Sequence, residues 1–376
     1  MTWAAAALFL ILIALYVKDK SPRHALYSVA REALKGVMLL RVHMPALERV
    51  LHGRLLQNCS RSPYRRTRKD VSHSPLLLNL PTSDGSGEAT HPDVLRVLEG
   101  WGAGGWTWLM SATPYPSGDD FLENPELYVS YDGLRWFSPG GGVNPIARVP
   151  AEGWRDLKKE YHSDASLLLR DGTLYLYYRW SGVAFDKTIE NRIYLVTSTD
   201  GLKWSERTLV LEEKGTRAQN RGFLSPSVLF LNGEYVMWTV ERENGERFIV
   251  RRTGADGLNW SPPARTSIGA DYALSEPWHL DVIQRADGDE LILLLTTANN
   301  RGSDTELHLG FGDPEGHGWR MAGKLIEPGY FFERREIYRS SLVSLGGDRY
   351  ALFYSALSGD RTWGVARLEN VISNCS

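Results

Sequence analysis

A short phrase with Asp-Gly at its centre and Trp at its end recurs along the chain and limits what it can fold into. The copies are Ser130-Tyr-Asp-Gly-Leu-Arg-Trp136, Ser198-Thr-Asp-Gly-Leu-Lys-Trp204, Gly254-Ala-Asp-Gly-Leu-Asn-Trp260 and, in degraded form, Gly312-Asp-Pro-Glu-Gly-His-Gly-Trp319. Their tryptophans are 56 to 68 residues apart, a spacing that indicates one supersecondary unit repeated about an axis. Asp-Gly favours a tight turn, because glycine accepts positive φ and aspartate hydrogen-bonds nearby backbone. We therefore expect these Asp residues to stabilise turns, with Trp packed over each turn.

A second repeat runs between these turns and consists of a polar start, a hydrophobic strand, a glycine turn and another strand. The clearest copy covers residues 164–178, and residues 225–238 match it almost position by position. Three further copies begin at His91, His279 and Arg339. Short β-rich segments with glycine turns at even spacing are typical of a propeller with four-stranded blades. The sequence therefore predicts an all-β fold, a five-bladed β-propeller over residues 75–376.

The residues before the propeller follow a different pattern. Residues 1–17 are almost all apolar and are followed at once by basic residues. This run is shorter than the roughly 20 residues of a full bilayer span, so a hydrophobic helix used for assembly is the alternative to a membrane anchor. Residues 18–74 combine helical periodicity with a basic stretch, which predicts a helical stalk and a linker. We expect a transmembrane helix that anchors the propeller at the cell surface or outside the cytoplasm, although the basic flank favours a cytoplasmic downstream side.

The amino-acid composition limits the kinds of molecule that the protein is expected to bind. A net charge of −2 over 376 residues gives no electrostatic footprint for nucleic acid, so no nucleic-acid partner is expected. The 13 Trp and 17 Tyr residues suit both sheet packing and surfaces that stack on sugars. Cys59 and Cys375 lie on either side of the repeats. A closed propeller brings its ends together, so a disulfide and two free thiols are equal alternatives that depend on the compartment.

The register of the second repeat places one polar residue of each copy at the start of an inner strand. These residues are His91, Asp164, Ser225, His279 and Arg339. Two positions further along each strand lie Asp93, Ser166, Ser227, Asp281 and Ser341. Because burying unpaired charge is costly, we expect the five strand starts to converge on a solvent-filled pocket at the axis. The alternative is that each is an isolated polar residue at the end of a loop.

The polar strand starts, the S-x-D-G-x-x-W turns and the blade count resemble the five-bladed β-propeller glycosidase superfamily, which includes arabinanases, xylosidases and invertases. The resemblance covers about residues 85–370. Several phrases are more closely similar to uncharacterised bacterial and phage propeller proteins classed as glycosidase-like; among them are Thr90-His-Pro-Asp-Val94, His162-Ser-Asp164 and Trp278-His-Leu-Asp-Val282. The resemblance implies a five-bladed fold and action on a glycan.

The chain departs from the catalytic triad that the resemblance implies. Members of the arabinanase type carry an Asp base at the first strand start, a second Asp at the next and a Glu acid at the third. Here Asp164 keeps the second acid, His91 occupies the first place with Asp93 two residues on, and Ser225 stands in the third segment without a Glu. The mechanism of those enzymes therefore cannot be copied onto this chain residue by residue.

A glycosidase nevertheless needs two carboxyl groups, one protonated and one ionised. The catalytic candidates are Asp164, Asp93, Asp281 and Glu123. The substrate-binding candidates are His91, His162, Arg179, Ser225, Trp278, His279 and Arg339. The histidines could bind sugar hydroxyls, shuttle protons or hold a metal, and the arginines could clamp an acidic sugar or pair with Asp164. No cofactor is expected, although a divalent cation in the axial pocket is compatible with these groups.

We therefore expect a glycoside hydrolase-like protein that acts on a polysaccharide through carboxylates and histidines at the axis. Asp164 is expected to be essential and to be held by Arg179 or His162. A non-catalytic glycan-binding propeller, such as a surface or virion adhesin, is the alternative, because the Glu of the third blade is missing. A protein-interaction module that uses its rim is a third hypothesis, which the concentration of polar groups at the axis disfavours.

Overall fold

The computed structural model describes most of the second of two units into which the chain divides, Met1–Arg65 and Arg66–Ser376. The described residues are 74–147, 157–184, 188–216, 222–269, 276–285, 288–299, 304–369 and 371–372. The expected anchor over residues 1–17 lies outside them, as do the stalk and linker up to residue 73 and both cysteines. Within the described ranges, no helix has the length and apolar character needed to cross a membrane.

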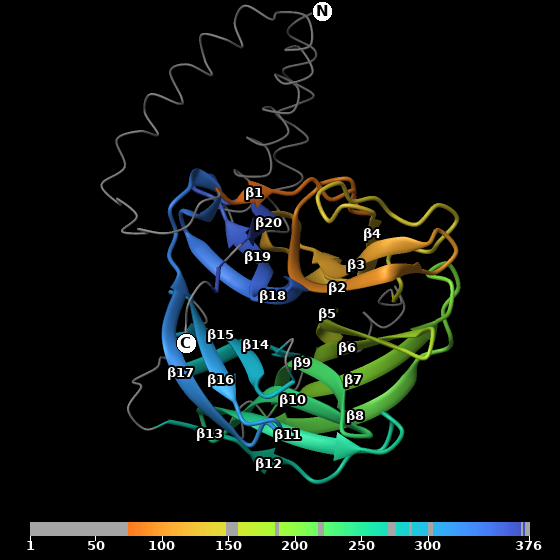
Figure 1. The fold of residues 1–376 in the computed structure, drawn as a ribbon. Helices are drawn as coiled ribbons and strands as arrows, with labels where there is room; N and C mark the ends of the chain where they lie inside the picture. Colours follow the sequence, from red (N-terminus) through yellow and green to blue (C-terminus); the bar gives the residue numbers. More distant parts are fainter. Residues whose placement is uncertain are drawn as a thin grey trace, which may run out of the picture. The chain divides into compact units, whose positions relative to one another are not determined.

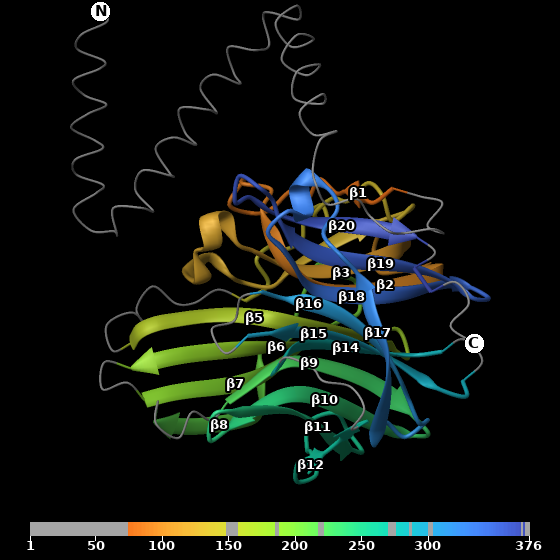
Figure 2. The same cartoon turned by 90° about the vertical axis from the view of Figure 1, so that its left-hand side faces the viewer.

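The described strands form five sheets around a central axis, which is the five-bladed β-propeller that the repeats predict (Figure 1). Blade 1 contains β2 (Ala89–Trp101), β3 (Trp106–Pro114) and β4 (Glu126–Ser130). Blade 2 contains β5 (Leu157–Arg170), β6 (Thr173–Ala184), β7 (Thr188–Ser198) and β8 (Thr208–Thr216), which run side by side in that order (Figure 2). Blade 3 contains β9 (Gly222–Leu231), β10 (Glu234–Glu243), β11 (Glu246–Gly254) and β12 (Ala264–Arg265).

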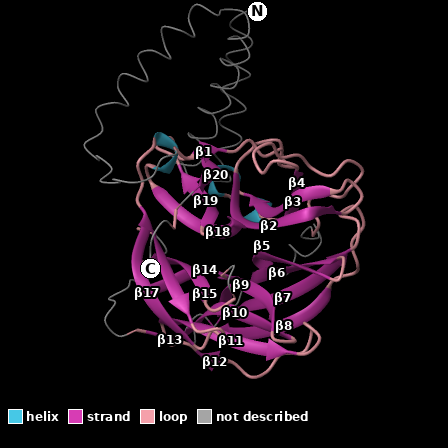
Figure 3. Ribbon diagram, in the orientation of Figure 1, coloured by secondary structure: helices cyan, strands magenta, loops and turns pink. Residues whose placement is uncertain are grey.

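Blades 4 and 5 complete the ring. Blade 4 contains β14 (Glu276–Gln284), β15 (Leu291–Ala298), β16 (Glu306–Gly312) and β17 (Gly318–Ile326), with β13 (Ser267–Ile268) added parallel to β17. Blade 5 contains β18 (Glu336–Gly346), β19 (Arg349–Leu357), β20 (Trp363–Glu369) and β1 (Leu76–Leu77). The helices of the described ranges are short 3-10 turns, η1 (Pro116–Gly118), η2 (Asp120–Leu122) and η4 (Phe331–Glu333) (Figure 3).

Two blades differ from the four-stranded pattern that we expected. Blade 1 has three strands in the described ranges, and Phe137 alone bridges to Val129 where a fourth strand would lie. Blade 4 gains β13 from the segment that leaves blade 3. Blade 5 is completed by β1, whose Leu76 and Leu77 pair with Arg367 and Ala366 of β20, so the two ends of the propeller region close the ring together.

The hydrophobic core is divided among the five interfaces between neighbouring blades. One buried cluster fills each interface, for example Leu280 and Leu293 against Trp238 between blades 3 and 4. Successive side chains of a strand point to opposite faces of its sheet, and here both faces are covered. In β15, Leu291 and Leu293 accordingly pack toward blade 3, whereas Ile292 and Leu294 pack toward blade 5. The sequences of the middle strands are therefore continuous apolar runs and do not alternate between polar and apolar residues.

The Asp-Gly turns have the structural role that the sequence predicts. Asp132 Oδ1 accepts the N–H groups of Leu134 and Arg135, both at 2.8 Å. Hydrogen bonds from this backbone hold the pKa of Asp132 below its ordinary value. Each turn also docks against another blade, as when Trp238 Nε1 of blade 3 donates to the carbonyl of Gly316 in blade 4 at 3.0 Å. The turns therefore connect neighbouring blades through hydrogen bonds and packing.

A ring of hydrogen bonds joins the five inner strands β2, β5, β9, β14 and β18 below their first residues. In each blade one side chain accepts the backbone N–H of the following blade, and the five pairs are Asp93 with Leu167, Ser166 with Val228, Ser227 with Val282, Asp281 with Leu342, and Ser341 with Val94. These are the residues two positions after the predicted axial ones. The ring satisfies backbone groups that the twist between blades leaves unpaired, and it fixes how the strand starts face one another.

Candidate active site at the propeller axis

The inner strands change direction where they begin. His91, Asp164 and Ser225, at equivalent places in blades 1 to 3, have φ of 55°, 52° and 47°. Residues other than glycine occupy this left-handed region at a cost of about 1–3 kcal/mol, and such strain concentrates at functional sites. In all five inner strands, the pairing with the next strand is irregular at this point. Bulges of this kind re-aim side chains, and here they turn polar groups toward the axis.

The carboxylate of Asp164 is the meeting point of these side chains. Its Oδ1 lies 3.1 Å from His279 Nδ1, 3.7 Å from His91 Nε2 and 3.5 Å from Arg339 Nη1. Ser225 Oγ donates to the same oxygen at 3.4 Å. The structure thus brings together all five predicted strand starts, which we call the axial cluster. Each member is exposed by 4% or less, so this level of the axis is a buried cluster, whereas we expected an open pocket.

The second oxygen of Asp164 is engaged as fully as the first. Arg179 Nε lies 2.9 Å from Oδ2, and Ser163 Oγ donates to it at 3.2 Å. Burial alone would raise the pKa of Asp164, but attraction to Arg179, then to His279 and His91, outweighs it and holds the pKa well below 3.8. Asp164 is therefore ionised at neutral pH, with Oδ1 facing both histidines and Oδ2 facing Arg179.

Glu123 approaches the axial cluster from the loop after η2. Its side chain is buried, and Oε1 lies 3.8 Å from His91 Nδ1. The loop is fastened to blade 2, because His162 N–H donates to the Glu123 carbonyl at 3.2 Å and His162 Nδ1 lies 3.0 Å from Asn124 Oδ1. Burial, and then repulsion from Asp164, raises the pKa of Glu123 well above 4.5. Two carboxyl groups whose pKa values are driven apart are the usual mark of an acid and its charged partner.

Both histidines of the axial cluster are neutral at neutral pH, because burial lowers the pKa of His91 and of His279 below 6.5. His279 Nδ1 lies 2.6 Å from Ser225 Oγ, and His91 Nδ1 lies 3.1 Å from Thr113 Oγ1. His279 Nε2 is buried and has no hydrogen-bond partner among the residues that the structure describes. A buried nitrogen of this kind calls for an explanation such as an ion or a ligand.

His91, Asp164 and His279 satisfy the chemistry of a cation site. Each offers one ligand atom, and the three atoms all lie within 4.8 Å of one another. Neutral imidazole and ionised carboxylate are the forms that bind Zn²⁺ and related divalent metals. Asp313, Glu315 and His317 form a second group of potential ligands, but they are exposed and Asp313 accepts backbone N–H groups of its own turn. The buried donor set therefore fits a divalent cation, and the exposed one is explained by its turn.

Tyr338 covers the two histidines with its ring. The ring centroid lies 4.6 Å from that of His279 and 5.5 Å from that of His91. Trp278 Nε1 donates to the Tyr338 hydroxyl at 2.7 Å, and the Arg247 guanidinium lies 4.2 Å from the centroid of the Trp278 ring. Tyr338 and Trp278 are partly exposed, in contrast to the axial cluster beneath them. An aromatic surface with polar tips at this position suits contact with the face of a sugar.

The remaining predicted site residues have mainly supporting contacts. Asp93 and Asp281 lie in the hydrogen-bonded ring, one layer below Asp164, and burial followed by repulsion from Asp281 raises the pKa of Asp93 to about 7. Arg339 Nη2 donates to the carbonyls of Ala165 and Pro226 at 2.7 and 3.4 Å. These three side chains bind the blades to one another, and Asp93 and Asp281 each accept a backbone N–H group of the next blade.

Sequence reasoning missed Tyr338 and Ser163. A signal for both was present, since each directly precedes a residue of the axial cluster, as Trp278 precedes His279. Because the bulge turns the strand start toward the axis, the residue before it lies next to the same centre. The position before each predicted strand start therefore also predicts a residue close to the axis.

Comparisons with known proteins agree with this fold. No protein-family model matches the chain. The A type blood N-acetyl-α-D-galactosamine deacetylase of Flavonifractor plautii is 26% identical over 325 residues, which cover 73% of this chain and 40% of that protein. The chain thus spans well under half the length of that curated relative.

Solved structures show the same similarity. The crystal structure of an N-acetylgalactosamine deacetylase from F. plautii in complex with blood group B trisaccharide has a TM-score of 0.68 at 22% identity, over 80% of this chain and 95% of that one. An α-L-arabinanase mutant from Cellvibrio cellulosa has a TM-score of 0.50 at 14% identity, over 74% and 90%. The chain therefore has the five-bladed β-propeller fold of arabinanase-type glycosidases, a fold also found in that deacetylase.

Proposed function

We propose that the protein is a glycan-processing enzyme that removes an N-acetyl group from a sugar, with a divalent cation held by His91, Asp164 and His279. The observation that carries this proposal is the buried donor set, in which two neutral imidazoles meet one ionised carboxylate and His279 Nε2 has no hydrogen-bond partner among the described residues. The similarity to a deacetylase supports the choice of reaction. Metal-assisted hydrolysis is a reaction class that such a donor set serves.

Hydrolysis of an N-acetyl group joins water to the acetyl carbon, breaks the C–N bond and leaves an amine that needs a proton. A divalent cation held by His91, Asp164 and His279 would polarise the acetyl oxygen and lower the pKa of water. Glu123, whose carboxyl favours the protonated state, donates the proton to the departing nitrogen. Arg179 fixes Asp164, while Tyr338 and Trp278 orient the imidazoles and contact the sugar.

Glycoside hydrolysis is the second candidate, and the pairing of Glu123 with Asp164 favours it. One carboxyl group that favours the protonated state and one ionised carboxylate are what a glycosidase needs. His279 Nε2, which has no hydrogen-bond partner among the described residues, and the sequence similarity to a deacetylase favour removal of the acetyl group, however. We therefore rank removal of the acetyl group first.

The test separates these reactions by their products. The full-length protein is treated with EDTA and then supplied with Zn²⁺, Mn²⁺ or Ca²⁺ in the presence of N-acetylated oligosaccharides, including the A-type blood-group trisaccharide. Acetate release that depends on the cation supports deacetylation, whereas new reducing ends without acetate support glycoside hydrolysis. Binding without either product supports the non-catalytic glycan-binding alternative. Absence of binding and turnover across the panel would reject every carbohydrate function.

A matched pair of variants locates the cation. His279→Ala removes a buried ligand of the proposed site, and His317→Ala removes a histidine of the exposed group at the Asp313 turn. We expect His279→Ala to abolish acetate release and cation binding measured by isothermal titration calorimetry, while His317→Ala retains both. Equal cation binding by the two variants would show that the axial donor set is not the metal site.

The apolar run over residues 1–17 supports a separate proposal, that the propeller is tethered to a membrane at the cell surface or outside the cytoplasm. Fractionation of cells that produce the full-length protein and a form that begins at residue 18 tests this. Recovery of both forms in the same fraction would contradict the tether, and protease added to intact cells reports the side on which the propeller lies.

A further inference from the structure

Two arginines lie directly opposite each other on neighbouring strands of blade 3. Arg242 of β10 pairs with Arg247 of β11, close to the turn that joins the two strands. The side chains of such a cross-strand pair share one face of the sheet, and like charges in this arrangement are destabilising. Burial, and then repulsion from Arg242, lowers the pKa of Arg247 below its ordinary value. We call Arg242 and Arg247 the arginine pair.

The arginine pair has more positive charges than negative partners. Arg247 Nη1 donates to Glu276 Oε2 of blade 4, and within the described residues this is the one carboxylate that either arginine binds. The Arg247 side chain is only 4% exposed, yet its Nε has no hydrogen-bond partner among the residues that the structure describes. Arg242 Nε is likewise buried without a partner in these ranges. A buried donor without a partner points to a ligand.

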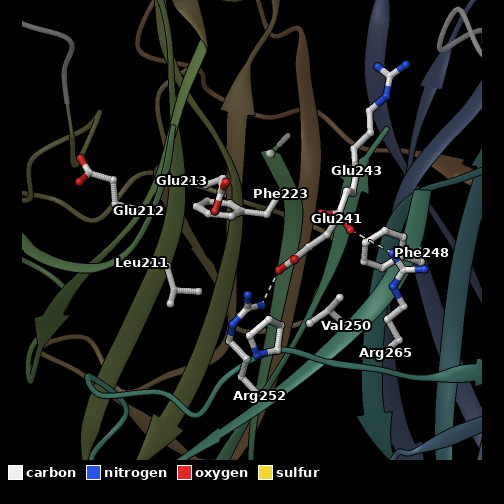
Figure 4. Close-up of a pocket in the computed structure, with 13 residues that line it drawn as sticks. Leu211, Glu212, Glu213, Phe223, Glu241, Glu243, Phe248, Val250, Arg252 and Arg265 are labelled. Atoms are coloured by element: carbon white, nitrogen blue, oxygen red, sulfur yellow. Dashed lines mark hydrogen bonds and ion pairs between the residues drawn. The ribbon is translucent and has the colours of Figure 1, made fainter. Parts of the chain in front are cut away.

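On the opposite face of the same strands, the charges are matched. Glu241 pairs with Arg252 (Figure 4). Arg265 Nη2 donates to Glu243 at 3.2 Å. Successive residues of a strand point to opposite faces, so Glu241 and Glu243 lie across the sheet from Arg242. The acidic neighbours of Arg242 in the sequence therefore neutralise other arginines.

The arginine pair lies beside the aromatic surface that covers the axial cluster. The Arg247 guanidinium lies 4.2 Å from the centroid of the Trp278 ring, and Trp278 Nε1 donates to the Tyr338 hydroxyl. Trp278, Tyr338 and Arg242 are partly exposed, and the Glu276 side chain is 33% exposed. A ligand on the Tyr338–Trp278 surface is therefore next to the arginine pair without entry into the buried axial cluster.

An oxyanion supplies what the arginine pair lacks. A guanidinium group presents its N–H donors in a planar fork that matches the oxygens of a carboxylate or a sulfate. A negative charge between two facing guanidinium groups also offsets their repulsion. The sequence suggested that Arg179 and Arg339 could clamp an acidic sugar, but both hold Asp164 instead. The arginine pair has the exposure and the unmatched charge for that role.

We infer that the arginine pair binds an anionic group of the glycan, a carboxylate or a sulfate ester, on the sugar that contacts Trp278. The inference rests on the proposed glycan-processing function and names its substrate class, an acidic N-acetylated glycan. Arg242 and Arg247 donate hydrogen bonds to the anion, and Glu276 keeps Arg247 in place. The arginine pair thereby selects acidic glycans over neutral ones.

Matched pairs of ligands measure the contribution of the charge. The first pair is a hyaluronan tetrasaccharide, which carries N-acetyl groups and carboxylates, and the same tetrasaccharide with its carboxylates converted to methyl esters. The second pair is a chondroitin tetrasaccharide with and without sulfate groups, with methyl esters in both members. Binding to the full-length protein is followed by isothermal titration calorimetry. Preference for the acid in the first pair identifies a carboxylate, and preference for the sulfated member of the second identifies a sulfate ester.

Arg242→Gln is the test variant, because it removes one positive charge and keeps the ion pair of Arg247 with Glu276. We expect its preference for the anionic ligand over the uncharged one to be about tenfold weaker than that of the parent protein. Arg320→Gln is the matched control, since it removes an arginine that is 70% exposed on β17, and it should keep the parent's preference. Arg242→Gln should unfold at a temperature no lower than the parent's, because the cross-strand repulsion is gone.

Three outcomes would overturn the inference. Equal binding of charged and uncharged ligands by the parent protein, or an equal preference in the parent and Arg242→Gln, would show that the arginine pair binds no anion. A lower unfolding temperature for Arg242→Gln would show that Arg242 stabilises the fold. Absence of binding to all four ligands would reject acidic glycans as the substrate class. Acetate release from the neutral A-type trisaccharide is measured separately, so none of these results decides the proposed function.

Discussion

Arg179 Nε lies 2.9 Å from Asp164 Oδ2, and both side chains are almost completely buried. Arg339 reaches the other oxygen of the same carboxylate from blade 5, with its Nη1 at 3.5 Å. One negative charge thus faces two guanidinium groups in a site of low dielectric constant. Because the neighbouring imidazoles are neutral, Asp164 is the group that makes burial of both arginines tolerable.

Asp164→Asn should therefore affect folding as well as activity. Removal of the charge leaves Arg179 and Arg339 without their shared partner, and breaking a buried pair in this way lowers the free energy of unfolding by about 3–5 kcal/mol. We expect a clear loss in urea-induced unfolding, together with loss of turnover. The double variant Asp164→Asn/Arg179→Met should recover part of the stability and none of the activity. A single variant as stable as the parent would contradict this account.

Glu123→Gln should separate catalysis from stability. A carboxyl group that favours the protonated state is replaced by an amide of the same size, so the packing of the η2 loop is kept. The amide is too weak an acid to supply the proton that the departing nitrogen needs, and we expect kcat to fall about 10²- to 10⁴-fold. The midpoint of thermal unfolding should move little. Unchanged kcat would remove Glu123 from the mechanism.

His308→Gln should reduce the loss of folding stability that the protein undergoes as the pH falls from 7 to 5. His308 Nε2 lies 3.4 Å from Glu306 Oε2 and 3.3 Å from Thr297 Oγ1. Burial lowers the pKa of His308 below 6.5 even though Glu306 opposes the shift. The unfolded chain therefore takes up this proton first, and the stability from a neutral His308 is present above pH 6.5 and lost as pH falls below it.

Thermal unfolding midpoints between pH 7 and pH 5 measure this contribution. The fall over that interval should be smaller in His308→Gln than in the parent protein. His317→Gln, which replaces an exposed histidine, serves as the control for the loss of one imidazole. Identical slopes for the parent and His308→Gln would mean that His308 has no part in the pH dependence of folding.

Gly316→Ala and Gly172→Ala should differ in stability although both glycines have a similar positive φ, 70° and 74°. A methyl group on Gly316 would overlap the buried indole of Trp238, whereas no atom of the described residues lies within 4 Å of a carbon added to Gly172. Both variants share the conformational cost of about 1–2 kcal/mol. Gly316→Ala should lose about 1–3 kcal/mol more, the cost of overpacking. Equal losses of unfolding free energy in the two variants would show that the contact between Gly316 and Trp238 adjusts to the extra methyl group at little cost.

The sequence was sufficient to predict the blades because each repeat carries its own local signals. Asp132 with Gly133 specifies a turn through bonds made within a few residues, so the turn could be read without knowing its neighbours. Equivalent strand starts such as His91 and Asp164 could be aligned for the same reason. Closure of the ring then brings equivalent positions together, and the convergence at the axis followed from the register alone.

The sequence could not show how the polar residues divide between support and chemistry. Asp93 and Asp164 are both acids near a strand start, yet one accepts a backbone N–H of the next blade and the other holds two arginines. That difference depends on which face of a bulged strand each residue occupies. The position of Tyr338 before Arg339 could place it near the axis, but its ring contacts with His91 and His279, which belong to other blades, could not be read from the sequence.

The pairing of β1 with β20 also determines when the ring of blades can close during synthesis. Val94 is bound by Ser341 and His91 N–H by Ser355 Oγ, so blade 1 stays without one neighbour until blade 5 has left the ribosome. At translation rates of about 5–20 residues per second, this wait is on the order of 10–50 s. During that time the apolar face of blade 1 around Trp108 and Met110 is open to chaperones and to other nascent chains. A chain that ends before residue 339 therefore has at most four blades, an uncovered apolar face on blade 1 and an incomplete axial cluster.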